Sequence, residues 1–383
     1  MPSVTDPSGR ESTKMMSMAR RLALLATLIV AGCVTSTTST GLPPTGPPAP
    51  SGCGAGMTLA PAASAGCLPD VTGPPETEAP SQVAGELTFT TETFRVPTGA
   101  HPHDVAVASD GGIWYTGQQN GTLGWLDPQT GDVREARLPA GAAPHGVVTG
   151  PDGAGWVTDQ GLDAIVRVTP GEFEVDAFSA PGTSPHTPVF DFDGMVWFTG
   201  AAGWIGRLDP ATGDVDRFPA PRGAGPYGIT VTPSNEIWFV SLQQSYLGKV
   251  DKATGDVTVI EPPTANAGTR RVWSDSTGRL WISYWNAGMV AVYDPADESW
   301  REWDLPGGGN QAYSMYVDEL DAVWLSDFGQ NAVVRFDPET ETFLSFESNR
   351  ANAAVRQMLG RPGEAWGAES GVDRLVVFRY GTD

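Results

Sequence analysis

From about residue 100 onward, the chain consists of short runs in which apolar and polar residues alternate, separated by Gly, Pro, Asp and Asn. The first unit contains four such runs, at 104–108, 113–116, 122–126 and 133–138. Alternation with a period of two is typical of strands with one buried face, and the short polar links are typical of antiparallel turns. The pattern predicts a sheet of four antiparallel strands.

A tryptophan in the second run of each unit shows that this unit repeats. It recurs at intervals of 41 to 43 residues, at Trp114, Trp156, Trp197, Trp238, Trp281, Trp324 and Trp366. Units of this length, rich in short β-branched and aromatic runs, are typical of propeller blades and not of helical repeats. We therefore predict an all-β protein, a seven-bladed β-propeller.

The two ends of the repeat region complement one another. The seventh unit ends with its third strand, at 376–380, whereas an unassigned strand-like run at 90–97 precedes the first unit. An N-terminal strand placed beside the last blade would complete that blade and cover its open edge. We predict that residues 86–383 form one closed propeller.

Aspartates also recur in the links between the third and fourth strands, as in 127–132, 209–214, 251–256 and 337–340. Asp in first place, Pro and then Gly are turn residues. This favours a structural turn over a calcium loop.

The first 33 residues have the features of an export signal. Arg20 and Arg21 precede an apolar stretch at 22–31, followed by Gly32 and Cys33. The tetrad Val30–Cys33 resembles a bacterial lipobox, in which the cysteine becomes lipidated; a plain secretory peptide and a short core helix are the alternatives. We expect residues 1–33 to be a lipoprotein signal peptide, with translation starting at Met1 or at one of the later methionines. The mature protein is then extracytoplasmic and held to the cell membrane through Cys33.

Residues 34–85 are rich in Ser, Thr, Pro, Gly and Ala. Such a segment buries too little apolar surface to fold, so we expect a disordered tether. Cys53 and Cys67 lie within it, and they form either a disulfide or two free thiols.

The charge narrows the range of partners. With 23 basic and 45 acidic residues the chain has a formal net charge of -22. No basic stripe is present to neutralise phosphates, so we expect no nucleic-acid partner. The sequence contains no glycine-rich phosphate loop, Cys-x-x-Cys pair or His-Glu-x-x-His helix. We expect a monomer.

Alignment of the units on their tryptophans reveals where the repeats differ. The residues eleven positions earlier are His103, His145, His186, Tyr227, Arg270, Tyr313 and Val355, and the remaining histidine, His101, lies two residues from His103. One position per blade predicts a single ring at the mouth of the central channel, the usual ligand site of such a fold. The alternative is that a Pro-His dipeptide inherited by duplication merely shapes the loop.

A second ring is predicted three residues after each tryptophan. Its carboxylates, Asp159, Asp327 and Glu369, either orient a histidine or hold a cation, or they are solvated polar residues at strand ends.

Several units resemble repeats of the virginiamycin B lyase family, also called streptogramin B lyases. The resemblance rests on Pro144-His145-Gly146-Val147, on 226–230 with Pro-Tyr-Gly-Ile-Thr, and on 204–208 with Trp-Ile-Gly-Arg-Leu. It implies a C–O lyase that linearises a cyclic depsipeptide by elimination: a histidine base removes a proton α to the carbonyl, and magnesium polarises the substrate. It also implies catalytic roles for His145, His186 and Tyr227. Ser184 and Ala201 stand where the family carries glutamates, so the cofactor stays unknown, with a divalent metal such as magnesium the one the family implies.

These observations give two functional hypotheses. The first is a lyase opening a cyclic ester or depsipeptide, with His145 or His186 as base, Tyr227 donating to the leaving oxygen and Arg270 steadying enolate charge. His101, His103, Tyr313 and the second-ring carboxylates then bind a small-molecule or cyclic-peptide substrate. The second is a non-catalytic surface propeller that binds a ligand or a protein.

Overall fold

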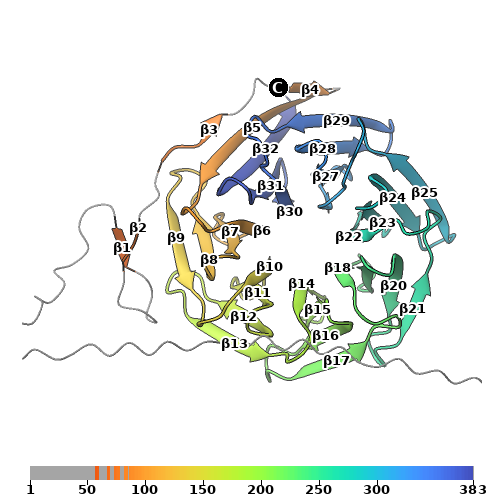
Figure 1. The fold of residues 1–383 in the computed structure, drawn as a ribbon, viewed down its shortest axis with the longest axis horizontal. Coiled ribbons are helices and arrows are strands. Elements are labelled where there is room, and N and C mark those ends of the chain that lie inside the picture. The colour runs from red at the N-terminus through yellow and green to blue at the C-terminus, as the bar shows by residue number, and fades with distance from the viewer. Residues whose placement is uncertain (1–56, 60–66, 70–72, 78–81, 85, 383) are drawn as a thin grey trace, which may run out of the picture. The chain divides into compact units, whose positions relative to one another are not determined.

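The structure is a computed structural model that describes residues 57–59, 67–69, 73–77, 82–84 and 86–382. Its described secondary structure is entirely β, with seven blades arranged around a central axis (Figure 1). Among the described residues, no helix is long and apolar enough to cross a membrane. The predicted seven-bladed propeller is confirmed.

Each blade is an antiparallel sheet whose first strand lies next to the axis. Blades one to three comprise β6 (Pro102–Val107), β7 (Ile113–Gly117), β8 (Thr122–Leu126), β9 (Val133–Arg137); β10 (Pro144–Thr149), β11 (Gly155–Asp159), β12 (Ala164–Val168), β13 (Val175–Ser179); and β14 (Pro185–Phe190), β15 (Val196–Gly200), β16 (Trp204–Leu208), β17 (Val215–Pro219). Blades four to six comprise β18 (Pro226–Val231), β19 (Ile237–Ser241), β20 (Tyr246–Val250), β21 (Val257–Ile260); β22 (Thr269–Ser274), β23 (Leu280–Tyr284), β24 (Met289–Asp294), β25 (Ser299–Asp304); and β26 (Tyr316–Val317), β27 (Val323–Asp327), β28 (Ala332–Asp337), β29 (Thr342–Glu347). The seventh blade contains β30 (Val355–Arg361), β31 (Glu364–Glu369) and β32 (Arg374–Thr382).

The ring closes as predicted. β5 (Leu87–Arg95) pairs antiparallel with β32 in continuous register from Leu87 opposite Thr382 to Arg95 opposite Arg374. In Figure 1 the orange β5 lies along the blue β32, so the first folded segment completes the last blade. The strand begins at Leu87, earlier than the run at 90–97 suggested.

Four short strands occur within residues 34–85, the segment expected to be a tether. β1 (Met57–Leu59) pairs with β2 (Cys67–Pro69), and both β3 (Glu76–Thr77) and β4 (Gln82–Ala84) pair with β5. β3 and β4 pair there because β5 is an outermost strand whose free backbone groups accept further strands, a driving force that composition does not reveal. Cys33, Cys53 and the expected signal peptide lie outside the described residues.

The repeated tryptophans form the cores between blades. Each is at most 2% exposed. The indole N–H of Trp197, Trp281 and Trp324 donates to a carboxylate six residues earlier at 2.9 to 3.0 Å. Six of the seven rings are buried with their one donor satisfied, whereas Trp114 Nε1 has no partner among the described residues.

The recurrent aspartates are turn residues, as predicted. Asp127 Oδ1 accepts the Gln129 N–H at 2.8 Å, and Asp209 and Asp251 make the same bond two residues onward. Gly131 in the same turn has φ of 79°, which favours glycine.

Candidate functional site

The ring residues sit at an irregularity in the innermost strands. In β6, β10, β14 and β18 the pairing register shifts directly after the proline that precedes the ring residue. A β-bulge of this kind redirects a side chain. Here it directs one side chain per blade toward the axis.

Hydroxyl groups two residues after the tryptophans hold these positions in register. Thr116 Oγ1 donates to the backbone carbonyl of His145 at 2.8 Å, and Thr158 Oγ1 donates to that of His186 at 2.7 Å. Thr199 makes the same contact to Tyr227. Blades one, two and three therefore each position the ring residue of the next blade, a role that the repeated Thr indicated but that was not predicted.

The side chains form a closed ring. Neighbouring rings from His103 through His145 and His186 to Tyr227 lie 3.8, 3.8 and 3.6 Å apart between centroids. Arg270 continues the series, with its guanidinium carbon 4.4 Å from the centroid of Tyr227 and 3.7 Å from that of Tyr313. The Tyr313 hydroxyl then contacts His103 Nε2 at 3.2 Å.

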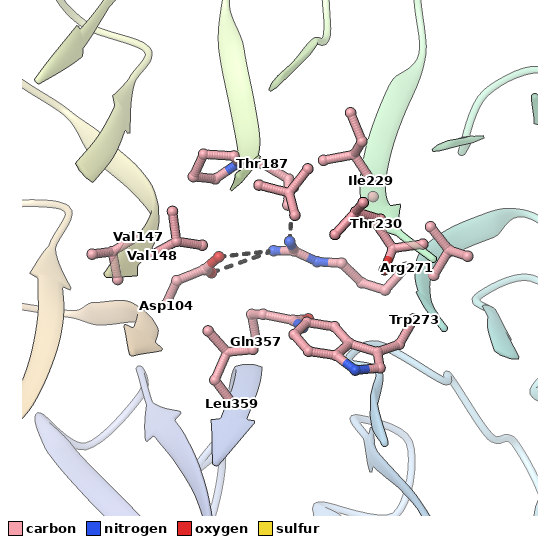
Figure 2. A pocket seen from close by; sticks show the side chains of 15 residues that line it. Asp104, Val147, Val148, Thr187, Ile229, Thr230, Arg271, Trp273, Gln357 and Leu359 are labelled. Carbon is pink, nitrogen blue, oxygen red and sulfur yellow. Dashed lines mark hydrogen bonds and ion pairs between the residues drawn. The ribbon is translucent and has the colours of Figure 1, made fainter. Parts of the chain in front are cut away.

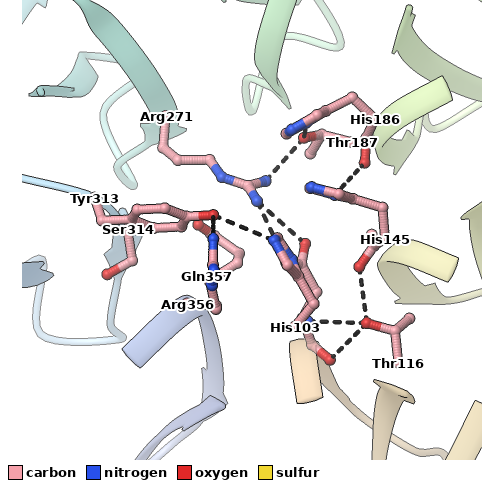
Figure 3. A network of polar contacts seen from close by, with 12 residues as sticks. His103, Thr116, His145, His186, Thr187, Arg271, Tyr313, Ser314, Arg356 and Gln357 are labelled. Atoms are coloured by element: carbon pink, nitrogen blue, oxygen red, sulfur yellow. Dashed lines mark hydrogen bonds and ion pairs between the residues drawn. The ribbon is translucent and has the colours of Figure 1, made fainter. Parts of the chain in front are cut away.

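The seventh blade departs from the pattern. Val355 supplies no polar group, and Arg356, the next residue, donates from Nη1 to the Tyr313 hydroxyl at 3.0 Å (Figure 3). Arg356 was not predicted, because it lies one position outside the aligned column.

The ring is more enclosed than the sequence suggested. We expected side chains facing an open mouth, but His103, His145 and His186 are only 2%, 4% and 2% exposed. The reason is mutual stacking: six large side chains converging on one axis cover one another. Tyr227 and His101 are half-buried.

The hydrogen bonds fix the tautomer of His145. Its Nδ1 lies 3.1 Å from the carbonyl oxygen of His186, which can only accept, so Nδ1 carries the proton and Nε2 the lone pair. His186 Nδ1 lies 2.8 Å from Thr187 Oγ1, a hydroxyl that accepts from Arg271 and can either donate to or accept from the imidazole. His186 Nε2 has no partner among the described residues.

His103 has both nitrogens engaged. Its Nδ1–H donates to Asp104 Oδ1 at 2.7 Å, and Nε2 accepts from the Tyr313 hydroxyl, which itself accepts from Arg356. His103 is a positioning residue, whereas His145 keeps a free lone pair: no described residue bonds its Nε2.

All three imidazoles are held neutral. Burial is the main cause that lowers the pKa of His103, His145 and His186 well below the usual value, and nearby Arg271 lowers each of them further. A neutral imidazole is the form that accepts a proton.

A second layer lies directly beneath the ring. Arg271, 1% exposed, reaches across the axis from β22, donating to Thr187 at 2.8 Å and to both oxygens of Asp104 at 3.3 and 3.4 Å (Figure 2). None of these three residues was predicted to belong to the site. Each follows a ring residue directly, and that adjacency was the available signal.

The second-ring carboxylates bond to neighbouring loops through one oxygen each, while Asp159 Oδ2, Asp327 Oδ2 and Glu369 Oε2 are buried with no partner among the described residues. Asp159 Oδ1 accepts the backbone N–H groups of Ala143 and Leu162, and Asp327 Oδ1 accepts those of Gln311 and Gly329. Glu369 accepts the hydroxyl of Ser348. These side chains stabilise loops, because a carboxylate at a strand end lies within reach of loop amides.

His101 is also placed elsewhere. Its backbone adopts φ of 45°, its N–H donates to Asp373 at 2.8 Å, and no contact joins it to the described ring residues.

The site does not fit magnesium. His103, Asp104 and His145 each offer a ligand atom, all within 4.8 Å of one another. Magnesium prefers an octahedron of oxygens, however, and this group has one carboxylate, already bonded to Arg271 and His103. The adjacent guanidinium groups of Arg270 and Arg356 would also repel a dication.

Comparisons with solved structures agree with the fold. Virginiamycin B lyase from Staphylococcus aureus is 18% identical with a TM-score of 0.71, covering 76% of this chain and 99% of that one. A catalytically inactive histidine-to-alanine variant of that enzyme with quinupristin is 19% identical, with the same coverage and TM-score. YCF48 bound to D1 peptide is 18% identical with a TM-score of 0.61, covering 79% of this chain and 99% of that one.

Sequence comparison identifies the family. A search of curated proteins finds no match. The family model of the virginiamycin B lyases matches residues 81–336, well over half of the chain. The chain therefore belongs to the virginiamycin B lyase family.

Proposed function

We propose that the protein is a C–O lyase that opens a cyclic ester or depsipeptide, with His145 as the general base. The observation that carries the proposal is the fixed tautomer of His145: the bond from Nδ1 to the His186 carbonyl leaves a lone pair on Nε2, on an imidazole kept neutral by burial. A neutral imidazole with a free lone pair is suited to removing a proton α to a carbonyl.

The elimination balances without water. The proton goes to His145 Nε2, the C–H electron pair becomes a C=C bond, and the bond from the β-carbon to the ester oxygen breaks, so that the oxygen leaves as a carboxylate. Tyr227 accepts a hydrogen bond from Arg270 Nη2 at 2.5 Å, so its own proton can be transferred to the leaving oxygen once it gives up its hydrogen bond to Tyr313. Burial raises the pKa of Tyr227, so it stays protonated.

Arginine supplies the positive charge in this scheme. Arg270, stacked between Tyr227 and Tyr313, stabilises the developing enolate by its fixed charge. The test is incubation with a cyclic depsipeptide followed by mass spectrometry. An elimination product has the mass of the substrate, whereas hydrolysis adds one water.

The second candidate is a binding propeller without catalysis. It is favoured by the burial of the histidines and by the complete hydrogen bonding of His103, and YCF48, of similar fold, was solved with a peptide bound. Saturable binding of the depsipeptide without any ring-opened product would support this candidate instead.

For location, we propose export and anchoring to the cell membrane through a lipid on Cys33. The support is the apolar stretch ending in Val30-Ala31-Gly32-Cys33.

A further inference from the structure

Positive charge accumulates on the propeller axis. Arg270, Arg271 and Arg356 come from β22 and β30 and converge on the ring, where Asp104 is the carboxylate that bonds one of them. Arginine does not lose its proton in proteins. Three guanidinium groups against one carboxylate leave a buried excess of positive charge, in a chain whose formal net charge is -22.

The pKa of Tyr313 reflects this excess of positive charge. Burial alone raises the pKa of a phenol, yet the pKa of Tyr313 is lowered, because the positive charges of Arg270, Arg356 and Arg271 outweigh burial. The pKa of the neighbouring Tyr227 is raised instead, by burial and by the charge of Tyr313, which outweigh the lowering by Arg270 and Arg271.

A cavity adjoins this charge. Along the inner strands beyond the ring lies a cavity of about 130 Å³. Arg271, Asp104 and Thr187 form its polar end, and its walls are mostly apolar, among them Val148, Ile229 and Trp273, with Gln357 and Thr230 adding polar groups (Figure 2). A cavity of about 150 Å³ accommodates benzene. The space therefore suits a molecule of roughly that size with one charged end.

We propose that this cavity binds a small organic carboxylate, with the carboxylate against Arg271 and the apolar body between the inner strands. Arginine recognises carboxylates through paired N–H donors. The Arg271–Asp104 contacts of 3.3 and 3.4 Å are longer than strong charge-assisted hydrogen bonds, so Asp104 does not fully satisfy the guanidinium. The site does not depend on the proposed lyase activity, since it lies beyond the ring and uses Arg271, not His145.

The test is calorimetric titration of the full chain with benzoate and with benzamide. Benzamide has the same shape and no charge, so we expect benzoate to bind about tenfold more tightly or better. Arg271→Gln should abolish benzoate binding. Val148→Phe, which fills the cavity and leaves every axial charge in place, should do the same.

Two variants keep the result interpretable. If Arg271→Gln fails to fold, as judged by circular dichroism, benzoate titration of Val148→Phe alone tests the proposal. His145→Phe should retain benzoate binding, so failure of the lyase proposal and failure of this one are separable. Absence of benzoate binding, equal binding of benzamide, or unchanged binding by folded Val148→Phe would overturn the proposal.

Discussion

His145 donates its Nδ1 proton to the backbone carbonyl of His186 at 3.1 Å. This contact between neighbouring blades fixes which nitrogen of His145 is basic. Thr158, which lies on the same blade as His145, donates to the same carbonyl at 2.7 Å, so blade two positions the acceptor as well as the base. The proposed chemistry thus depends on the register between blades two and three.

The pH dependence of turnover should reflect the environment of the base. Burial lowers the pKa of His145 well below the usual value, so the active neutral form persists on acidification. We expect kcat/KM to stay level from pH 8 to about 6.5 and to fall only at lower pH. A midpoint above pH 7 would contradict the assignment of the base.

The free energy of unfolding should also depend on the protonation of His103, His145 and His186, and it should fall as the pH falls. The folded-state pKa values of the three histidines lie below those of the unfolded chain, so the unfolded state binds more protons and stability is lost as pH falls below about 6.5. Each histidine contributes at most about 1.4 kcal/mol per pH unit. Urea unfolding at pH 7.5 and 5.5 measures the loss, and His186→Phe, which keeps the aromatic contacts, should reduce it.

N-terminal truncations should distinguish the contribution of β5, which closes the ring, from that of β3 and β4, which cover the edge of β5. A chain starting at residue 73 should melt like the full chain. Starting at 86 removes β3, β4 and the contacts of Glu76 with Arg95, Arg350 and Arg374, at a cost of about 1 kcal/mol.

Starting at 97 removes β5 and opens the propeller, so a large fall in the melting temperature is expected. Equal melting temperatures of the chains starting at 86 and 97 would refute the closure of the propeller by β5.

Membrane attachment should depend on one thiol. Cys33→Ser should move the protein from the membrane fraction to the soluble fraction, because the lipid is attached at that residue. Cys53→Ser serves as the control and should leave the fractionation unchanged. A wild-type protein that washes off membranes would exclude the anchor.

The periodic features were predictable from the sequence. Each tryptophan fills the same core position, so its spacing reveals the blades, and the column containing His145 and Tyr227 gives the ring. The Arg271–Asp104 pair was not predictable in this way, because its partners are 167 residues apart and meet only when the ring closes. The loop contacts of Asp159 and Asp327 were not predictable either, because a periodic carboxylate in sequence does not show which backbone amides it accepts.

The measurement that most directly tests the account is turnover of a cyclic depsipeptide in the presence of EDTA. Because Arg270 and not a metal is assigned the charge-stabilising role, wild-type protein should form a ring-opened product of unchanged mass at the same rate with and without chelator. His145→Phe, which keeps the ring stacking and removes the base, should lower kcat by about 10²- to 10⁴-fold while the protein stays folded. Activity lost with EDTA, a product heavier by one water, or undiminished turnover by His145→Phe would contradict the account.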